Sequence, residues 1–390
     1  MSKQNTWFMS LRPPRILIIT HSLYNRAGVE GHIRTFSSYL ADKYQFWITF
    51  PAQGQLYLRN PQGHHTSFPC EELSIIAPYH APKISSSVQK IIEIAQPDII
   101  HIMHFLGWHL GVIEQAKLSG INTVISFHDY FALTPLWTLQ GEDDPLKVVY
   151  PDYALTWFNT DISKYLIDRR AVLTESINNI NHTIVPSEFL ATKLSVVFNN
   201  NFTIIPYGIN PFQCASPKKI ERANFRFGYL GALIPQKGWQ VLVASFKVLQ
   251  RDYPNTELHL FGGVQELPKS TDRIFYHGAF DEADLPVILS LFDVAIIPSI
   301  FPETFCIVLS EIWESNKVAA VSDIGALGHR VHDGVNGRKF RAGDVQSTTE
   351  ILRWFLENDS WQSFKVPKPT YISECAAKYD SLYKEALKAK

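Results

Sequence analysis

Two glutamates eight residues apart, Glu303 and Glu311, carry the clearest chemical signal in this 390-residue chain. They flank the start of a helix predicted over residues 304–315, and eight helical residues rise about 12 Å, so the two carboxylates cannot serve one atom. They could hold the two ends of an extended, hydroxyl-rich ligand, because carboxylates accept strong hydrogen bonds, with the helix N-terminus facing a phosphate between them. The alternative is a glutamate favoured by the helix dipole and an unrelated surface glutamate.

Two glycine-containing turns join a predicted strand to a predicted helix. One contains Gly28, and the other runs from Gly231 to Gly238 with Lys237 next to the helix start. Glycine allows close approach of backbone to a ligand, and the N–H groups of a helix start favour anions. A lysine at that position opposes the helix dipole, which makes sense if an anion binds there too. Ordinary turns and a solvated lysine are the alternative.

His128 follows a strand predicted over residues 123–127, at the edge where open α/β sheets place functional groups. Histidine suits acid–base work or a hydrogen bond to a sugar hydroxyl, although a single histidine is more often structural. The other histidines near strand ends do not have metal-binding spacing on one helix: His101, His104 and His109. The acidic run 142–144 is typical of a solvated turn, so no metal site is predicted.

Composition excludes several classes of protein. With 46% hydrophobic and 19% charged residues the chain is not intrinsically disordered, and a net charge of −1 gives no field that would recruit nucleic acid. The four cysteines lie far apart without a CxxC pair, which argues against a zinc site or a disulfide scaffold and favours a reducing cytoplasm. The polar start of the chain and the lack of long apolar runs predict neither a secretion signal nor a membrane span. No G-x-G-x-x-G follows the first strand, which argues against a nicotinamide dehydrogenase.

Short strands alternate with longer helices, as in βαβ units around parallel sheets. The predicted strands are 15–20, 46–50, 99–103, 123–127, 182–185, 225–230, 257–261, 274–276, 294–298 and 318–322. The predicted helices are 28–41, 84–95, 107–119, 162–177, 238–251, 282–291, 304–315, 345–356 and 374–389. An irregular insertion is expected from about 131 to 157, and the proline-bearing segment 206–211 reads as the boundary between two α/β halves.

Nine short motifs occur in a fixed order along nearly the whole chain. They are Ala27-Gly28-Val29-Glu30, Gln96-Pro97-Asp98-Ile99-Ile100-His101, Ser126-Phe127-His128-Asp129-Tyr130, Val185-Pro186-Ser187-Glu188, Ile205-Pro206-Tyr207-Gly208-Ile209-Asn210, the 231–238 loop, Pro298-Ser299, the E-x7-E segment and Asp333-Gly334-Val335-Asn336-Gly337. Each motif is weak alone, whereas their order and spacing are specific. With them the chain resembles the GT-B glycosyltransferases of family 4, which are retaining and use nucleotide sugars.

The resemblance implies an α/β fold with two Rossmann-like, doubly wound domains that face each other across a cleft. Residues 1–208 would bind the acceptor, residues 209–369 would bind the nucleotide sugar, and the helix over 370–390 would return to the first domain. The implied reaction moves a hexose-type sugar from a UDP-, GDP- or ADP-linked donor to a hydroxyl acceptor, with no cofactor and no metal. The base, the sugar, the acceptor and the oligomeric state are not predicted.

The resemblance also assigns roles to residues. Lys237 would hold the donor diphosphate, Glu303 the sugar hydroxyls and Glu311 the ribose, while His128 would line the reacting face. The catalytic residues would be His128, Glu303 and Lys237. The base would lie near Gly262 and the 276–278 segment, and the N–H groups of Phe305 and Cys306 would help Glu303 to bind the sugar. The donor site as a whole would comprise Gly28, Gly231, Ala232, Lys237, Gly262, His277, Gly278, Glu303, Phe305, Cys306, Ile307 and Glu311.

This sequence departs from the family pattern at three positions. Ala232 stands where the family usually has an arginine that partners the lysine, so a phosphate contact is missing unless Arg26 or Arg330 supplies it. Cys306 replaces a common glycine in the E-x7-E segment, and Ala27 replaces the first of two loop glycines. The Ala232 departure keeps open a non-catalytic GT-B scaffold or binding subunit, and an epimerase or phosphorylase is a further alternative.

The first 70 residues carry a charge surplus of +5, from seven cations against two acids. The seven cations are Lys3, Arg12, Arg15, Arg26, Arg34, Lys43 and Arg59. Together with Trp108, Trp137 and Trp157 this surplus would suit peripheral contact with an anionic inner membrane face and a lipid-linked acceptor. Scattered solvated charge is the favoured alternative. A cytoplasmic protein that binds a nucleotide sugar and a hydroxyl acceptor, and no nucleic acid, is the overall prediction.

Overall fold

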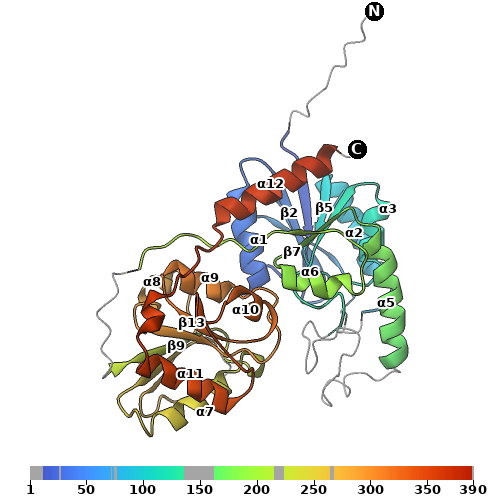
Figure 1. Cartoon of the computed structure of the whole chain (residues 1–390). Coiled ribbons are helices and arrows are strands. Elements are labelled where there is room, and N and C mark those ends of the chain that lie inside the picture. Colours follow the sequence, from blue (N-terminus) through green and yellow to red (C-terminus); the bar gives the residue numbers. More distant parts are fainter. Residues whose placement is uncertain are drawn as a thin grey trace, which may run out of the picture.

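The computed structural model describes residues 12–25, 28–71, 73, 77–135, 162–214, 224–263 and 268–388. They form two lobes, each built around one β-sheet (Figure 1). Both sheets carry helices on both faces, so the predicted GT-B architecture of two doubly wound α/β units is confirmed.

The first lobe holds an eight-stranded sheet in the order β4-β3-β2-β1-β5-β6-β7-β8. The strands are β1 (Arg15–Ile19), β2 (Gln45–Ala52), β3 (Gln55–Arg59), β4 (His65–Pro69), β5 (Ile99–Ile102), β6 (Asn122–Ser126), β7 (His182–Val185) and β8 (Phe202–Ile204). All neighbours pair in parallel except β2 with β3 and β3 with β4, which form an antiparallel extension at one edge. That extension was not predicted, because most residues of β4 are exposed and its sequence has no apolar run that would indicate a strand.

Helices cover both faces of this sheet because successive residues of β1 point to opposite sides. Leu17 and Ile19 join a core beneath α2 (Pro82–Ala95), α3 (Val112–Leu118), α5 (Ile162–Asn178) and α6 (Glu188–Ser195). Ile16 and Ile18 join a second core beneath α1 (Gly28–Tyr39) and α12 (Ile372–Lys388). The alternation leaves β1 apolar on both faces, as expected for a central parallel strand.

The second lobe holds a six-stranded, fully parallel sheet in the order β11-β10-β9-β12-β13-β14. Its strands are β9 (Arg226–Leu230), β10 (Glu257–Phe261), β11 (Ile274–Gly278), β12 (Val294–Ile297), β13 (Ala319–Ser322) and β14 (Gly337–Phe340). In chain order this is the 3-2-1-4-5-6 arrangement of dinucleotide-binding folds. The strand order reverses between β9 and β12, so a ligand crevice is expected at their carboxyl ends.

The helices of the second lobe divide between its two faces (Figure 1). One face packs on α7 (Trp239–Leu249) and α11 (Val345–Glu357), and the other on α8 (Leu285–Ile288), α9 (Ile307–Glu314) and α10 (Gly325–Arg330). This lobe also contains the short 3-10 turns η2 (Pro235–Lys237), η3 (Glu282–Asp284) and η4 (Ser360–Ser363). In Figure 1, α9 and α10 lie on the side of this lobe that faces the first.

The chain passes between the lobes twice, and the two crossings lie side by side. Ile209 bridges to Tyr371, with the N–H of Ile209 donating to Thr370 O at 3.0 Å and the N–H of Ile372 donating to Ile209 O at 2.9 Å. Beyond the second crossing, α12 packs on α1 of the first lobe (Figure 1). The last helix therefore belongs to the core of the first lobe.

Several predicted element boundaries were wrong. The helix expected over 304–315 begins only at Ile307, because Cys306 adopts a left-handed backbone conformation that cannot continue a helix. The 12 Å separation inferred for Glu303 and Glu311 therefore does not apply. Similarly, α3 begins at Val112 rather than 107, and α6, α10, β8 and β14 were not predicted because they are short.

The structure corrects part of the membrane hypothesis. Trp108 is fully buried and its indole N–H donates to Thr20 O at 2.9 Å, so it cannot insert into a bilayer. Among the cations, Arg12 pairs with Asp98 and Lys43 with Asp380. Trp137, Trp157, Lys3, Arg26 and the acidic run 142–144 lie outside the described residues. In the described ranges no helix is long and apolar enough to span a membrane.

Candidate donor site between the lobes

The loop that precedes α9 is held by the first lobe. Thr304 Oγ1 donates to His128 O at 2.7 Å, and Tyr130 OH donates to Pro302 O at 2.7 Å. Ser187 Oγ donates to Thr304 O at 2.6 Å from the start of α6. These three bonds fix the backbone on both sides of Glu303, so the first lobe takes part in positioning that carboxylate.

Lys237 and Glu303 form an ion pair where β9 and β12 diverge. Lys237 Nζ lies 2.7 Å from Glu303 Oε1, and Ser299 Oγ donates to the same oxygen at 2.7 Å. The Glu303 residue is 6% exposed, whereas the Lys237 side chain is 30% exposed. Burial alone would lower the pKa of Lys237, but the nearby Glu303 carboxylate raises it above its ordinary value, so the ammonium stays charged. The sequence predicted an anion beside Lys237, and the Glu303 carboxylate is one such anion.

Gly28 and Ile307 bring the two lobes together beside this pair. Gly28 is the first residue of α1, and a Cβ built on it would lie 3.3 Å from Ile307 Cδ1 at the start of α9. Two helix N-termini, one from each lobe, therefore meet across the gap. Because helix N-termini carry partial positive charge, this arrangement favours an anion between them.

Cys306 occupies a backbone conformation that favours glycine, with φ 68° and ψ 86°. The carbonyls of Phe305 and Cys306 accept hydrogen bonds from Arg330 Nη1 at 2.7 and 2.8 Å. Arg330 also stacks on the Phe305 ring at 4.1 Å and donates to Ser310 Oγ at 2.7 Å. Burial raises the pKa of the Cys306 thiol to about 12, so the side chain adds no negative charge near Glu303.

We expect Cys306→Val to be destabilising by more than about 2 kcal/mol, because a β-branched residue at positive φ is strained more than cysteine. Cys306→Gly should change the free energy of unfolding by less than about 1 kcal/mol, since relief of backbone strain offsets the lost side chain and the added chain entropy. Urea denaturation of the two variants tests the difference. Equal stability would show that the left-handed conformation is not required.

Arg330 was raised from the sequence as a substitute for the arginine missing at position 232. The structure instead uses its guanidinium to hold the backbone before α9, and burial lowers its pKa to about 10. Ala232 itself is exposed, and its carbonyl accepts a hydrogen bond from Tyr229 OH at 2.8 Å. Sequence reasoning missed Tyr229, and it did not predict the contacts that Ser299 and Arg330 make here, because these contacts are tertiary.

Glu311 lies apart from the Lys237–Glu303 pair, in the second turn of α9. No described side chain donates a hydrogen bond to it, and burial together with the charge of Glu282 raises its pKa to about 7. Glu282 in turn accepts from Asn210 Nδ2 at 2.8 Å, next to the crossing between the lobes. Glu311 is therefore a half-buried carboxyl poised to titrate near neutral pH.

His128 is buried between the lobes. Its Nδ1 lies 2.6 Å from Tyr207 OH, and burial holds its pKa well below the ordinary value, so the imidazole is neutral. Its Nε2 has no hydrogen-bond partner among the described residues. The Phe305 ring meets the Tyr207 ring edge-on, with centroids 5.1 Å apart, so Tyr207 connects His128 to the loop before α9.

The residues predicted near the base lie at the ends of β10 and β11. Gly262 N–H donates to Gly278 O at 2.7 Å, and Gly231 N–H donates to Phe261 O at 2.9 Å, so these three glycines lie on adjacent strand ends. His277 is exposed, stacks on Phe261 at 4.2 Å, and lies with Nε2 3.0 Å from His259 Nδ1. The described residues contain no cluster of three or more potential metal ligands.

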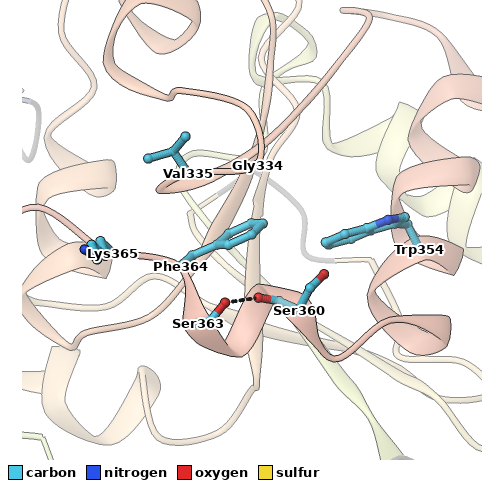
Figure 2. A pocket seen from close by; sticks show the side chains of 7 residues that line it. All are labelled: Gly334, Val335, Trp354, Ser360, Ser363, Phe364 and Lys365. Atoms are coloured by element: carbon cyan, nitrogen blue, oxygen red, sulfur yellow. Dashed lines mark hydrogen bonds between the residues drawn. The ribbon is translucent and has the colours of Figure 1, made fainter.

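A groove of about 460 Å³ lies away from these residues, between α11 and η4 (Figure 2). Trp354 and Phe364 form its aromatic sides, with ring centroids 6.1 Å apart and planes at 22° (Figure 2). Lys365 is its one charged lining residue. None of the sequence-predicted site residues lines this groove, so it is separate from the candidate donor site.

Two family profiles match successive parts of the chain. Residues 26–212 match the profile described as Glycosyltransferase Family 4, and residues 216–378 match that described as Glycosyl transferases group 1. Together with the two facing doubly wound units, these matches define the class as GT-B glycosyltransferases. The chain belongs to glycosyltransferase family 4.

Curated relatives and solved structures agree with this assignment. The chain is 28% identical over 183 residues to an uncharacterized glycosyltransferase, YqgM, of Bacillus subtilis, covering 43% of this chain and 49% of that protein. It is 28% identical over 165 residues to a phosphatidyl-myo-inositol mannosyltransferase of Mycobacterium leprae, covering 40% and 44%. The matches thus span about half the length of these curated relatives.

Solved structures share the fold over nearly the whole chain. A sucrose-phosphate synthase from Thermosynechococcus elongatus superposes with a TM-score of 0.70 at 16% identity, covering 97% of this chain and all of that one. Anabaena HepE in complex with UDP-glucose superposes with a TM-score of 0.64 at 15% identity, covering 95% and 99%. At these identities the similarity establishes the architecture.

Proposed function

We propose that this glycosyltransferase transfers a hexose from a nucleotide-diphosphate sugar to a hydroxyl acceptor with retention of anomeric configuration. The observation that carries the proposal is the Lys237–Glu303 pair, which lies where β9 and β12 diverge and is held by the first lobe through Thr304. Retention is the stereochemistry implied by the family resemblance. The UDP-glucose bound in the HepE complex supports a nucleotide-sugar donor.

Lys237 would neutralise the leaving diphosphate with the helix N-termini at Gly28 and Ile307, because positive groups placed where charge develops stabilise the transition state. Glu303 would accept hydrogen bonds from the sugar hydroxyls, and Glu311 from the ribose. The base would lie near Gly262, His277 and Gly278. His128 would border the reacting carbon as a neutral hydrogen-bonding group.

Binding and hydrolysis of donors test the proposal directly. Titration calorimetry with UDP, GDP and ADP should give micromolar binding of one of them, and the matching sugar donors should be hydrolysed slowly without acceptor. A Glu303→Gln variant should bind the nucleotide and lose hydrolysis. If none of the three nucleotides binds, the protein is the non-catalytic scaffold that Ala232 also suggests. The anomeric configuration of the product, read by NMR, tests retention.

We expect nucleotide affinity to depend on the ionisation of Glu311. Its pKa of about 7 means that it is largely protonated at pH 6 and ionised at pH 8, and the ionised form accepts stronger hydrogen bonds from ribose. The Kd of the preferred nucleotide should therefore fall from pH 6 to pH 8 more in the wild type than in Glu311→Gln. Comparison with the variant corrects for titration of the phosphate groups of the nucleotide, which affects both proteins equally. Parallel pH profiles would remove Glu311 from ribose binding.

The raised pKa of Glu311 also predicts how the stability of the protein depends on pH. Because the pKa of Glu311 in the folded state lies above its ordinary value of 4.5, the folded state binds the proton more tightly than the unfolded state does. The resulting stabilisation is present below about pH 4.5 and is lost as the pH rises through about 7. Glu311→Gln should therefore gain stability relative to the wild type as pH rises from 5 to 8. Thermal melts of both proteins across that range measure it.

Transfer should persist in EDTA, since Lys237 would supply the charge that a divalent cation supplies in other glycosyl transfers. The measurement is the initial rate of donor turnover with EDTA and with added Mg²⁺ or Mn²⁺. Loss of activity in EDTA that Mn²⁺ restores would contradict metal independence.

A further inference from the structure

Tyr207 lies in the first crossing between the lobes and bonds to His128. It follows β8 and is buried, with 6% of the residue exposed. The phenol oxygen lies 2.6 Å from His128 Nδ1, and the two rings stack with centroids 5.6 Å apart and planes at 20°. Within the described ranges the other ring nitrogen, Nε2, has no hydrogen-bond partner. Tyr207 is therefore the side chain that orients the His128 imidazole through a hydrogen bond.

Both lobes and the last helix hold Tyr207 in place. The next residue, Gly208, packs so closely on α12 that a Cβ built on it would lie 2.6 Å from Ile372 Cα. The rings of Phe305 from the second lobe and His32 from α1 lie with their centroids 5.1 and 4.7 Å from that of Tyr207. The phenol is therefore held at a defined point beside the imidazole, and one of the contacts that hold it comes from the loop before α9.

The direction of this hydrogen bond decides which nitrogen of the imidazole carries its proton. Burial holds the pKa of His128 well below, and that of Tyr207 well above, the ordinary value, so both groups are neutral. Among the described residues the phenol has no acceptor other than His128 Nδ1. If Nδ1 carried the proton, the buried phenol hydrogen would be left unpaired, which costs about 1–3 kcal/mol. The phenol therefore donates to Nδ1, and the imidazole proton lies on Nε2.

His101 shows how this pair differs from a structural one. Its Nδ1 lies 2.7 Å from Tyr383 OH, in a pair of the same chemistry within the same lobe. Its Nε2, however, lies 2.8 Å from Ser126 Oγ, so both ring nitrogens are paired inside the protein. His128 is 5% exposed, yet its Nε2 is unpaired within the described ranges. A buried N–H without an acceptor is costly, so the orientation that Tyr207 imposes points to an oxygen of a ligand as the acceptor.

We propose that Tyr207 is a positioning residue that keeps the proton of His128 on Nε2, so that His128 meets the sugar donor as a hydrogen-bond donor and not as a base. The proposal rests on the proposed transfer from a nucleotide sugar. A protonated Nε2 cannot take up a proton, but it can donate to an oxygen of the sugar donor and stabilise charge that develops there. Because Phe305 supports the Tyr207 ring from the second lobe, the orientation of His128 also depends on contact between the lobes.

Nitrogen-15 NMR of the full chain, labelled at its histidines, tests the position of the proton. The spectrum distinguishes a ring nitrogen that carries a proton from one that does not, and the signals of His128 are those that disappear in His128→Ala. We expect the wild type to carry the proton on Nε2. Tyr207→Phe, which keeps the ring and removes the hydroxyl, should populate the other tautomer as well. A proton on Nδ1 in the wild type, or identical His128 signals in Tyr207→Phe, would overturn the proposal.

Steady-state kinetics test the effect on turnover, with the sugar donor of whichever nucleotide binds among UDP, GDP and ADP. Tyr207→Phe should lower kcat about 3- to 10-fold, the effect of one neutral hydrogen bond, and leave the nucleotide Kd within about twofold. Tyr383→Phe is the matched control, because it removes the same kind of bond from His101, and its kcat should stay within about twofold. In a double-mutant cycle Tyr207→Phe should have no further effect on His128→Ala, because it acts through the imidazole.

Three kinetic results would count against the positioning role. They are an unchanged kcat in Tyr207→Phe, an equal loss in Tyr383→Phe, and losses from Tyr207→Phe and His128→Ala that multiply in the double variant. Failure of the proposed function is distinct, because then no nucleotide binds to the wild type. The NMR measurement needs no ligand and decides the tautomer in that case too. Melting temperatures within a few degrees of the wild type establish that the variants are folded.

Discussion

Lys237→Ala should lower kcat/KM for donor turnover by about 100- to 1000-fold, the loss typical of removing one preorganised electrostatic group. In the wild type the ammonium lies 2.7 Å from Glu303, and the pair is held against Ser299. Removing it takes away the charge that would meet the leaving diphosphate. It also leaves Glu303, which is 6% exposed, with the hydroxyl of Ser299 as the one side-chain hydrogen-bond partner that the described residues provide.

Lys247→Ala is the matched control, since Lys247 is an exposed lysine on α7, ten residues further along the chain. It should turn over donor at the wild-type rate. Steady-state kinetics measure both variants, and thermal melts check that both are folded. We expect Lys237→Ala to fold, because removing a partly exposed partner lowers the free energy of unfolding less than breaking a fully buried ion pair does. Near-normal turnover in Lys237→Ala would remove this residue from the mechanism.

Gly238→Ala should destabilise the second lobe by more than about 4 kcal/mol, in the range reached by severe backbone effects. Gly238 has φ 69°, and a Cβ on it would lie 1.8 Å from Pro298 O. The clash is with backbone at the exit of β12, so no side-chain rotation relieves it. Because Lys237 precedes Gly238 and Ser299 follows Pro298, any shift that relieves the clash also separates Lys237 from Glu303.

The expected drop in melting temperature is about 10 °C or more for a lobe of this size. Gly31→Ala is the control: Gly31 lies within α1, and the nearest atom to a new Cβ is Arg34 Nη2 at 4.0 Å. That change should stabilise the protein by about 0.5–1 kcal/mol, because alanine favours helix more than glycine. A Gly238→Ala protein that melts with the wild type would show that the turn adopts another conformation.

The sequence by itself predicted the alternation of strands and helices, the two facing α/β units and the family. A continuous apolar run such as Ile16–Ile19 is typical of a strand that is buried on both faces. Local motifs likewise identified Lys237, Glu303 and His128 as candidate site residues, because strand ends and glycine turns leave a local signature. Their catalytic roles stay predictions.

The tertiary structure decided what those residues touch. That Lys237 pairs with Glu303, 66 residues away, and that Thr304 bonds to His128, 176 residues away, follows from strand order and lobe contact, which leave no trace in local spacing. The contact between the rings of His21 and His104, whose centroids lie 4.3 Å apart, arises in the same way, because β1 and β5 are neighbours in space and distant in sequence. The α9 boundary also escaped prediction, since the positive φ of Cys306 belongs to a residue type that rarely adopts it and Arg330 holds it from another helix.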